Sequence, residues 1–158
     1  KISQVWRDAN NMVKNLANNR AMAFGKKGVI TVDAADQALI VPSGLKIFYP
    51  ELYGEKSDMG FEYSYKVRRG RSRLYGGKVI ENVCQALARI VIGEQMLMVA
   101  KKYRVVMTVH DAIACIAPEA EVETAKEYVE MCMRTRPDWG MELPLNCEAG
   151  YGTSYGAC

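Results

Sequence analysis

Residues 104–117 read RVVMTVHDAIACIA. Apolar residues dominate both halves of this stretch, and the polar pair His110 and Asp111 separates them. The pattern predicts two strands, 104–109 and 112–117, joined in a tight hairpin. A carboxylate between two apolar strands has little room to move, which suits a catalytic metal ligand. Asp is also common in ordinary hairpin turns, so the dipeptide alone leaves both interpretations open.

A long helix with one polar face is predicted over residues 78–102, where apolar residues recur at helical spacing. Its polar side chains lie three or four positions apart and share one stripe: Lys78, Glu81, Gln85 and Arg89, with Asn82 beside them. Gln and Arg suit hydrogen bonding to base edges and sugars in a nucleic-acid groove. A solvated face of an amphipathic helix has the same pattern.

Positive charge is concentrated just before that helix. Five basic residues fall within eight positions, Lys66, Arg68, Arg69, Arg71 and Arg73, and Tyr63, Tyr65 and Tyr75 surround them. Such a cluster can bind phosphates in a salt-sensitive manner. A solvated charged loop explains it equally well.

The remaining pattern predicts an α+β fold, an antiparallel sheet with helices packed on one face. A helix is expected over 2–23 and ends near Gly25. Short strands follow over 29–32, 39–41 and 45–49, then a loop over 54–60 and an edge strand over 61–67. A helix over 119–136 and a last strand over 143–148 complete the chain.

Composition excludes several classes of protein. The 158 residues suit one domain, and no apolar run approaches the roughly 20 residues that span a bilayer. Five scattered cysteines without a CxxC pattern favour reduced thiols over disulfides or structural zinc. The single histidine, His110, rules out a two-histidine metal site such as that of a zincin or an HD phosphohydrolase. A net charge of +3 neither requires nor excludes nucleic acid.

Four segments together resemble family A DNA polymerases of the bacteriophage and viral branch. Residues 75–89, YGGKVIENVCQALAR, are similar to the YGGKxxENxxQAxAR helix of that family, and residues 109–111, VHD, to its motif C. Residues 5–10, VWRDAN, resemble the WRxAN helix that follows the fingers, and residues 41–44, VPSG, the LPSG turn. The four matches occur in the family's order and span nearly the whole chain.

The resemblance implies a single palm segment over residues 1–158, the C-terminal part of a DNA-directed DNA polymerase. Its implied parts are the helix after the fingers (1–24), strands with the basic loop (29–74), the DNA-facing helix (75–102), the motif C hairpin (104–117), and a C-terminal helix, strand and tail (118–158). Such a nucleotidyltransferase acts in DNA replication, with no membrane, in the cytosol of a phage-infected or bacterial host.

The family's residue roles transfer to matching positions. Asp111 is expected to bind a catalytic Mg²⁺, and His110 to lie near the primer 3′ end. Gln85 is expected in the minor groove of the primer–template DNA, with Arg89 and Lys78 as weaker candidates. Asn82 and the basic loop (Arg68, Arg69, Arg71 and Arg73) complete the expected DNA contacts, and a dNTP is the second substrate.

This sequence departs from the family at several positions. Ala112 replaces the usual Glu of motif C, Ile90 replaces an Asp, and Leu45 replaces an Arg after the Ser-Gly turn. Motif A, with the second metal-binding Asp, and the nucleotide-holding fingers helix are both missing. We therefore expect half of a two-metal site, a palm that is incomplete without the upstream part of the enzyme, and an isolated fragment that is inactive.

Three interpretations stay open from the sequence. The first is a polymerase palm segment that works with its upstream remainder, in the same chain or as a separate subunit. The second is a non-catalytic relative that binds nucleic acid, which the lost carboxylates suggest. The third is an unrelated α+β protein with a chance His-Asp turn.

Overall fold

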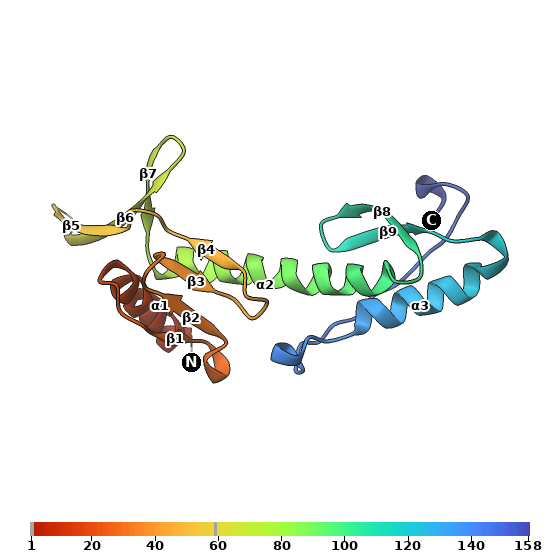
Figure 1. Cartoon of the computed structure of the whole chain (residues 1–158), viewed down its shortest axis with the longest axis horizontal. Coiled ribbons are helices and arrows are strands. Elements are labelled where there is room, and N and C mark those ends of the chain that lie inside the picture. Colours follow the sequence, from red (N-terminus) through yellow and green to blue (C-terminus); the bar gives the residue numbers. More distant parts are fainter. Residues whose placement is uncertain (1, 59) are drawn as a thin grey trace. The chain divides into compact units, whose positions relative to one another are not determined.

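The computed structural model describes residues 2–58 and 60–158. Within them it has three α-helices and three small antiparallel sheets, so the predicted α+β class is confirmed (Figure 1). The strands are divided among three sheets and do not form the single sheet that was expected. The chain separates into two compact units, residues 1–87 and 88–158, which are described in turn.

The first helix, α1 (Ile2–Ala17), ends earlier than predicted. Asn19 adopts the left-handed conformation with φ 52°. The amides of Asn19 and Arg20 then donate to the carbonyls of Leu16 and Asn15, a pairing that closes helix ends. Asn tolerates the left-handed region better than most residues, so Asn19 ends the helix before Gly25 is reached.

A four-stranded meander packs beside α1. Its strands are β1 (Ala23–Phe24), β2 (Ile30–Asp33), β3 (Ala38–Ile40) and β4 (Lys46–Phe48), in that order across the sheet. Met12 and Leu16 of α1 are fully buried with Ile30, Leu39 and Tyr49 of the sheet region. These side chains form the core of the first unit.

The second sheet corrects two predictions. Its strands are β5 (Tyr53–Ser57), β6 (Gly60–Val67) and β7 (Gly70–Leu74), and β6 lies in the middle. The expected loop over 54–60 is therefore largely strand, and the expected edge strand is central. β5 has the sequence YGEKS, in which no apolar alternation marks a strand. Its pairing with β6 is a tertiary effect that local sequence does not encode.

The second unit begins with the C-terminal half of the long helix. Helix α2 (Gly76–Val99) leads to the hairpin of β8 (Arg104–Val109) and β9 (Ala112–Ile116), and α3 (Val122–Arg134) follows. Val99, Tyr103, Ala125 and Cys132 form the buried cluster between these elements. Gln95 is also buried, and its amide donates to the carbonyls of Met133 (2.7 Å) and Thr135 (3.1 Å) at the end of α3.

The predicted last strand is wrong for the described residues. Residues 143–148 pair with no other strand. Pro144 lacks the amide that a ladder needs, and Arg134 holds the segment through Asn146 Oδ1 (3.1 Å) and the Cys147 carbonyl (2.8 Å). Among the helices that the structure describes, none is both long and apolar enough to cross a membrane.

Candidate active site and nucleic-acid interface

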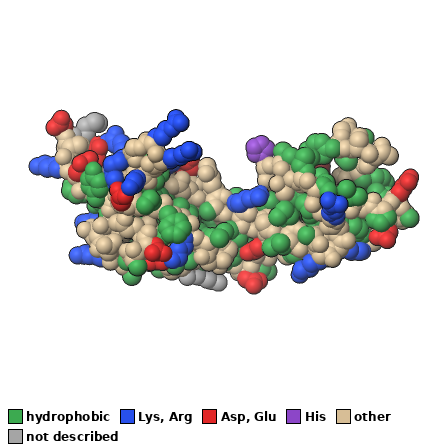
Figure 2. Space-filling model, turned by 45° about the horizontal axis from the view of Figure 1, so that its top comes forward, with side chains coloured by type: hydrophobic (Ala, Val, Ile, Leu, Met, Phe, Trp, Pro, Cys, Tyr) green, Lys and Arg blue, Asp and Glu red, His purple; other side chains and the backbone are tan. Residues whose placement is uncertain are grey.

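The β8–β9 hairpin forms as the sequence predicts. Val109 pairs with Ala112, so His110 and Asp111 are the two turn residues. His110 has φ 52°, in the left-handed region that Gly, Asn and Asp occupy more easily. A non-glycine residue held in this region costs about 1–3 kcal/mol, and His, like Asn and Asp, occurs there more often than most residues. Both side chains are exposed, and the single histidine is visible on the surface in Figure 2.

The two faces of the hairpin differ. Val105, Ile113 and Cys115 pack against the buried cluster, and burial raises the pKa of the Cys115 thiol. The register shifts between Val105 and Met107, which leaves Val106 as a bulge. The other face is apolar and open, since Met107 and Val109 are 37% and 41% exposed. A two-stranded sheet with an uncovered apolar face is typical of an incomplete sheet.

Asp111 can act as one ligand of a metal ion, but the described residues do not form a complete metal site around it. Its anionic oxygens are what Mg²⁺ prefers, and the short turn restricts its position. Asp111 also lines an open hollow of about 460 Å³ with β9, α3 and the C-terminal segment. Within residues 2–58 and 60–158, no three His, Cys, Asp or Glu side chains lie close enough together to hold a metal ion. The described residues therefore do not provide three side-chain ligands for a metal at Asp111.

The polar stripe of α2 is linked by hydrogen bonds around Glu81. Lys78 donates to Glu81 at 2.9 Å, and Gln85 donates to the other carboxylate oxygen at 3.4 Å. The bond to Glu81 raises the pKa of the Lys78 ammonium. Gln85 is exposed. Its amide nitrogen donates to Glu81, and this bond does not involve its amide oxygen. Arg89 follows one turn later and is also exposed.

Asn82 lies differently from its neighbours on the stripe. Its amide nitrogen donates to the hydroxyl of Tyr49 at 3.0 Å. Tyr49 is buried, and burial raises the pKa of its phenol while this bond opposes the shift. The Asn82 side chain is thus committed to the core of the first unit. Its role as a DNA contact stays a prediction that the geometry does not favour.

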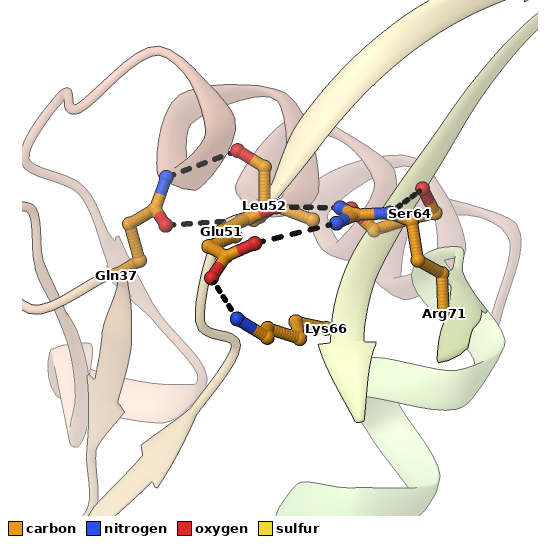
Figure 3. Close-up of polar contacts among 6 residues, drawn as sticks. All are labelled: Gln37, Glu51, Leu52, Ser64, Lys66 and Arg71. Carbon is orange, nitrogen blue, oxygen red and sulfur yellow. Dashed lines mark hydrogen bonds and ion pairs between the residues drawn. The ribbon is translucent and has the colours of Figure 1, made fainter. Parts of the chain in front are cut away.

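Three of the five basic residues before α2 are engaged within the second sheet. Glu51 accepts from Lys66 at 2.6 Å and lies 3.8 Å from the Arg71 guanidinium (Figure 3). Arg71 also donates to the carbonyls of Glu51 (2.6 Å) and Ser64 (2.8 Å). Its guanidinium lies 4.2 Å above the Tyr53 ring. Arg73 forms an ion pair with Glu62 but keeps 64% of its side chain exposed.

Arg68 and Arg69 lie at the turn between β6 and β7. Gly70 follows with φ 91°, a conformation that closes the turn. Neither arginine takes part in an ion pair or hydrogen bond with another described residue, and both are exposed. Figure 2 shows blue side chains gathered over this part of the first unit. The predicted basic loop thus separates into a structural base, with Lys66 and Arg71, and a free tip.

A junction between α1 and α2 was missed by the sequence analysis. The Asn10 side chain accepts from the Gly76 amide at 2.8 Å and so satisfies a free donor at the start of α2. A Cβ on Gly76 would lie 2.7 Å from that oxygen, and a Cβ on Gly77 would lie 2.5 Å from the Trp6 ring. Trp6 and Asn10 are one helical turn apart, the only signal of this contact in the sequence.

Comparison with known proteins gives one informative match. The chain is 31% identical over 126 residues to a DNA polymerase of Bacillus phage SP02. Part of this chain is homologous to part of a phage polymerase. The match covers 73% of this chain but only 18% of the relative's length. The activity of a whole polymerase is therefore a matter for proposal.

Protein-family models and solved structures give no further relatives of the chain. No protein-family model matches it, and no solved structure matches it. The polymerase relationship therefore rests on the phage relative, and the roles of single residues rest on the geometry described above.

Proposed function

We propose that this chain is the C-terminal palm segment of a family A DNA polymerase of the phage type. The reaction is template-directed nucleotidyl transfer, with primer–template DNA and a dNTP as substrates, in the cytosol of a bacterial or phage-infected host. The observation that carries the proposal is the position of Asp111. Asp111 has no ion pair or hydrogen bond with another described side chain and sits on a two-residue turn with a left-handed residue, in a chain that is partly homologous to a phage polymerase.

Asp111 supplies one carboxylate to a Mg²⁺ site that the upstream part of the enzyme completes. Mg²⁺ in such a site neutralises charge on the phosphate oxygens during transfer. Hairpin pairing on both sides of the turn fixes the Asp111 backbone, which limits where its carboxylate can lie before substrate arrives. His110, next to it and exposed, positions the primer 3′ end.

The outward face of the β8–β9 hairpin supports an upstream partner. Met107 and Val109 expose apolar surface there, and Ile116 is 59% exposed at the hairpin's other end. Covering this face with the remaining palm buries apolar area at about 25 cal/mol per Å². The same contact brings new carboxylates toward Asp111. Whether the upstream part is the same chain or a separate subunit does not change this geometry.

The exposed polar residues of α2 and the free arginine tip contact DNA. Gln85 and Arg89 are exposed side chains of the types that bind base edges and sugars, and Lys78 is weakened as a contact by its bond to Glu81. Arg68 and Arg69 bind phosphates. Arg73 contributes less to phosphate binding because it is paired with Glu62. Arg71 mainly supports the sheet.

A second function follows from the departures in sequence. Ala112 and Ile90 stand where the family resemblance places carboxylates, so the acidic surroundings of Asp111 are thinner. A non-catalytic relative would keep the DNA-binding residues and lose metal binding. The two functions differ in what Asp111 does.

The test is Asp111→Asn in the complete polymerase. Asn is nearly isosteric and suits a hairpin turn, so its melting temperature should change little. An amide is a poorer Mg²⁺ ligand, so extension should fall by about a thousand-fold or more. Asp138→Asn, an exposed Asp of the same unit, is the control and should extend normally. Normal extension by Asp111→Asn would remove the metal assignment, whereas a complete wild-type protein that binds DNA and extends no primer would favour the non-catalytic relative.

A further inference from the structure

A hollow in the first unit has walls unlike an ordinary surface groove. It holds about 490 Å³, beside β6 and β7 and against α1. Its aromatic walls are Phe61, Tyr63 and Tyr75, and its polar walls include Asn10 and Arg73. None of these side chains belongs to the site around Asp111.

Two of the three rings, Phe61 and Tyr63, can pack over the sheet because Gly54 leaves room for them. Phe61 and Tyr63 lie on the same face of β6, with ring centroids 5.3 Å apart. Gly54 pairs with Tyr63 across the sheet. A Cβ there would overlap the Phe61 ring and lie 2.8 Å from the Tyr63 ring. The glycine thus lets both rings lie down over the sheet.

Two of the three rings, Phe61 and Tyr75, are unusually open to solvent. Phe61 is 63% exposed and Tyr75 58% exposed. Large flat rings gain most from contact with another flat apolar surface, and every nucleobase offers one. An unstacked base therefore suits the hollow by shape and by chemistry.

Charge around the hollow favours a phosphate chain. The segment 53–75 has six basic and three acidic residues, a net +3 that equals the net charge of the whole chain. The guanidiniums of Arg68 and Arg69 have no ion pair or hydrogen bond with another described residue. Both arginines lie in the turn between Val67 and Gly70. This closing pair lies four residues along the hairpin from the Tyr63–Leu74 pair. At roughly 3.3 Å per strand residue this is about 13 Å, a span of up to about four nucleotides.

We propose that this hollow holds an unstacked base of single-stranded DNA, whose phosphates follow the β6–β7 hairpin to Arg68 and Arg69. The inference rests on the proposed polymerase function and adds a single-strand site separate from Asp111. A segment of the remaining polymerase is the alternative occupant. It would desolvate the Arg73–Glu62 ion pair, in which the Arg73 side chain is 64% exposed, and that desolvation is costly.

The binding test uses the chain of residues 1–158 and labelled oligothymidylate, with fluorescence anisotropy as the readout. An oligomer of the same length with abasic sites keeps the phosphates and removes the bases. Stacking on aromatic side chains predicts tighter binding of the thymidylate by about five-fold or more. Equal binding of the two oligomers would overturn the proposal.

Substitutions locate the site. Phe61→Leu and Tyr75→Leu should each weaken thymidylate binding by about five-fold or more, and leave abasic binding nearly unchanged. Phe48→Leu is the control, since Phe48 is an exposed aromatic of the same unit outside the hollow. Melting temperatures identify a variant that fails to fold, in which case the other variant decides. Binding equal to that of the control overturns the proposal.

The arginine tip has its own test. Arg68→Gln with Arg69→Gln should reduce the slope of log affinity against log salt by about 1.4, the loss of two single-strand phosphate contacts. Arg7→Gln with Lys14→Gln removes the same charge from α1 and should change the slope less. Equal changes in the two double variants would overturn the role of the tip.

The two proposals fail in different measurements. If Phe61→Leu instead weakens association with the upstream polymerase and leaves DNA binding unchanged, the hollow is a protein contact and the inference is wrong. Asp111→Asn still tests the polymerase function in that case. Conversely, an active Asp111→Asn polymerase leaves equilibrium binding of single strands by the hollow unaffected.

Discussion

His110 has two properties that favour different substitutions. Its left-handed backbone, φ 52°, is better suited to Gly, while its exposed imidazole lies beside the candidate metal ligand Asp111. If His110 only shapes the turn, replacing it with Gly should stabilise the fold and leave activity unchanged. If the His110 imidazole positions substrate, the same replacement should lower activity. Measuring both stability and activity therefore separates the two roles.

We expect His110→Gly to raise the free energy of unfolding by up to about 1 kcal/mol, because the left-handed strain is relieved. Primer extension by the complete polymerase should fall at the same time. Asn19→Gly is the matched control, since Asn19 also has φ 52° but ends α1. It should leave extension unchanged. Unaltered extension in His110→Gly would assign His110 to the turn alone.

Among the elements, α2 shows how one residue type serves opposite purposes. Gly76 and Gly77 admit Asn10 and Trp6 of α1, and neither position has space for a Cβ. Gly93 lies in the same helix, and apart from the neighbouring helix backbone no atom of the described residues lies within 4 Å of a Cβ placed on it. The first two are needed for close packing of helices, whereas Gly93 is only a weak helix former.

Alanine substitutions test this difference by chemical denaturation. Gly77→Ala should lower the free energy of unfolding by about 1–3 kcal/mol, because the Trp6 ring must move. Gly93→Ala should raise it by up to about 1 kcal/mol through helix propensity alone. If both substitutions stabilise the chain, the Trp6 contact does not constrain the start of α2.

The β2–β3–β4 meander has a pH-dependent clamp. Lys46 donates to Asp33 and Asp36, each at 2.7 Å. The hydrogen bond from Lys46 holds the pKa of Asp33 below its ordinary value of 3.8. Asp33 therefore stabilises the fold above pH 3.8, and this contribution is lost as pH falls through the lowered folded pKa.

Asp33→Asn should flatten the fall of melting temperature in acid, measured from neutral pH to well below 3.8. Lys46→Gln should have a similar effect because it removes the partner. A wild-type acid profile in Asp33→Asn would show that the clamp does not contribute to stability.

For the whole molecule, the central question is completeness. Among the described residues, no three possible metal ligands lie close enough together to hold an ion, and the β8–β9 hairpin has an open apolar face. The chain also spans only 18% of its phage relative's length. A polymerase reaction needs more carboxylates and a nucleotide-binding part than these residues supply.

We expect the purified chain of residues 1–158 to extend no primer with Mg²⁺ and dNTPs, because the metal site needs further ligands. The complete polymerase, assayed in parallel, is the positive control. Extension above that of an identically purified Asp111→Asn chain would show that these residues form a working site by themselves.

The sequence alone determined the local features. Apolar periodicity predicted α1, α2 and α3 and the strands of the β8–β9 hairpin, because these elements follow from side-chain spacing along the chain. The polar pair His110 and Asp111 predicted the turn between two apolar strands. The order of short motifs indicated a relative of DNA polymerases, and the partial homology to the phage SP02 polymerase agrees with it.

Only the tertiary structure decided which side chains are free. The five basic residues before α2 look equivalent in sequence, yet Glu51 and backbone carbonyls engage Lys66 and Arg71 and leave Arg68 and Arg69 at the tip. Strand β5 and the central place of β6 likewise depend on pairing between segments. The physical reason is that hydrogen bonds and ion pairs join residues far apart in the chain, which local propensity does not specify.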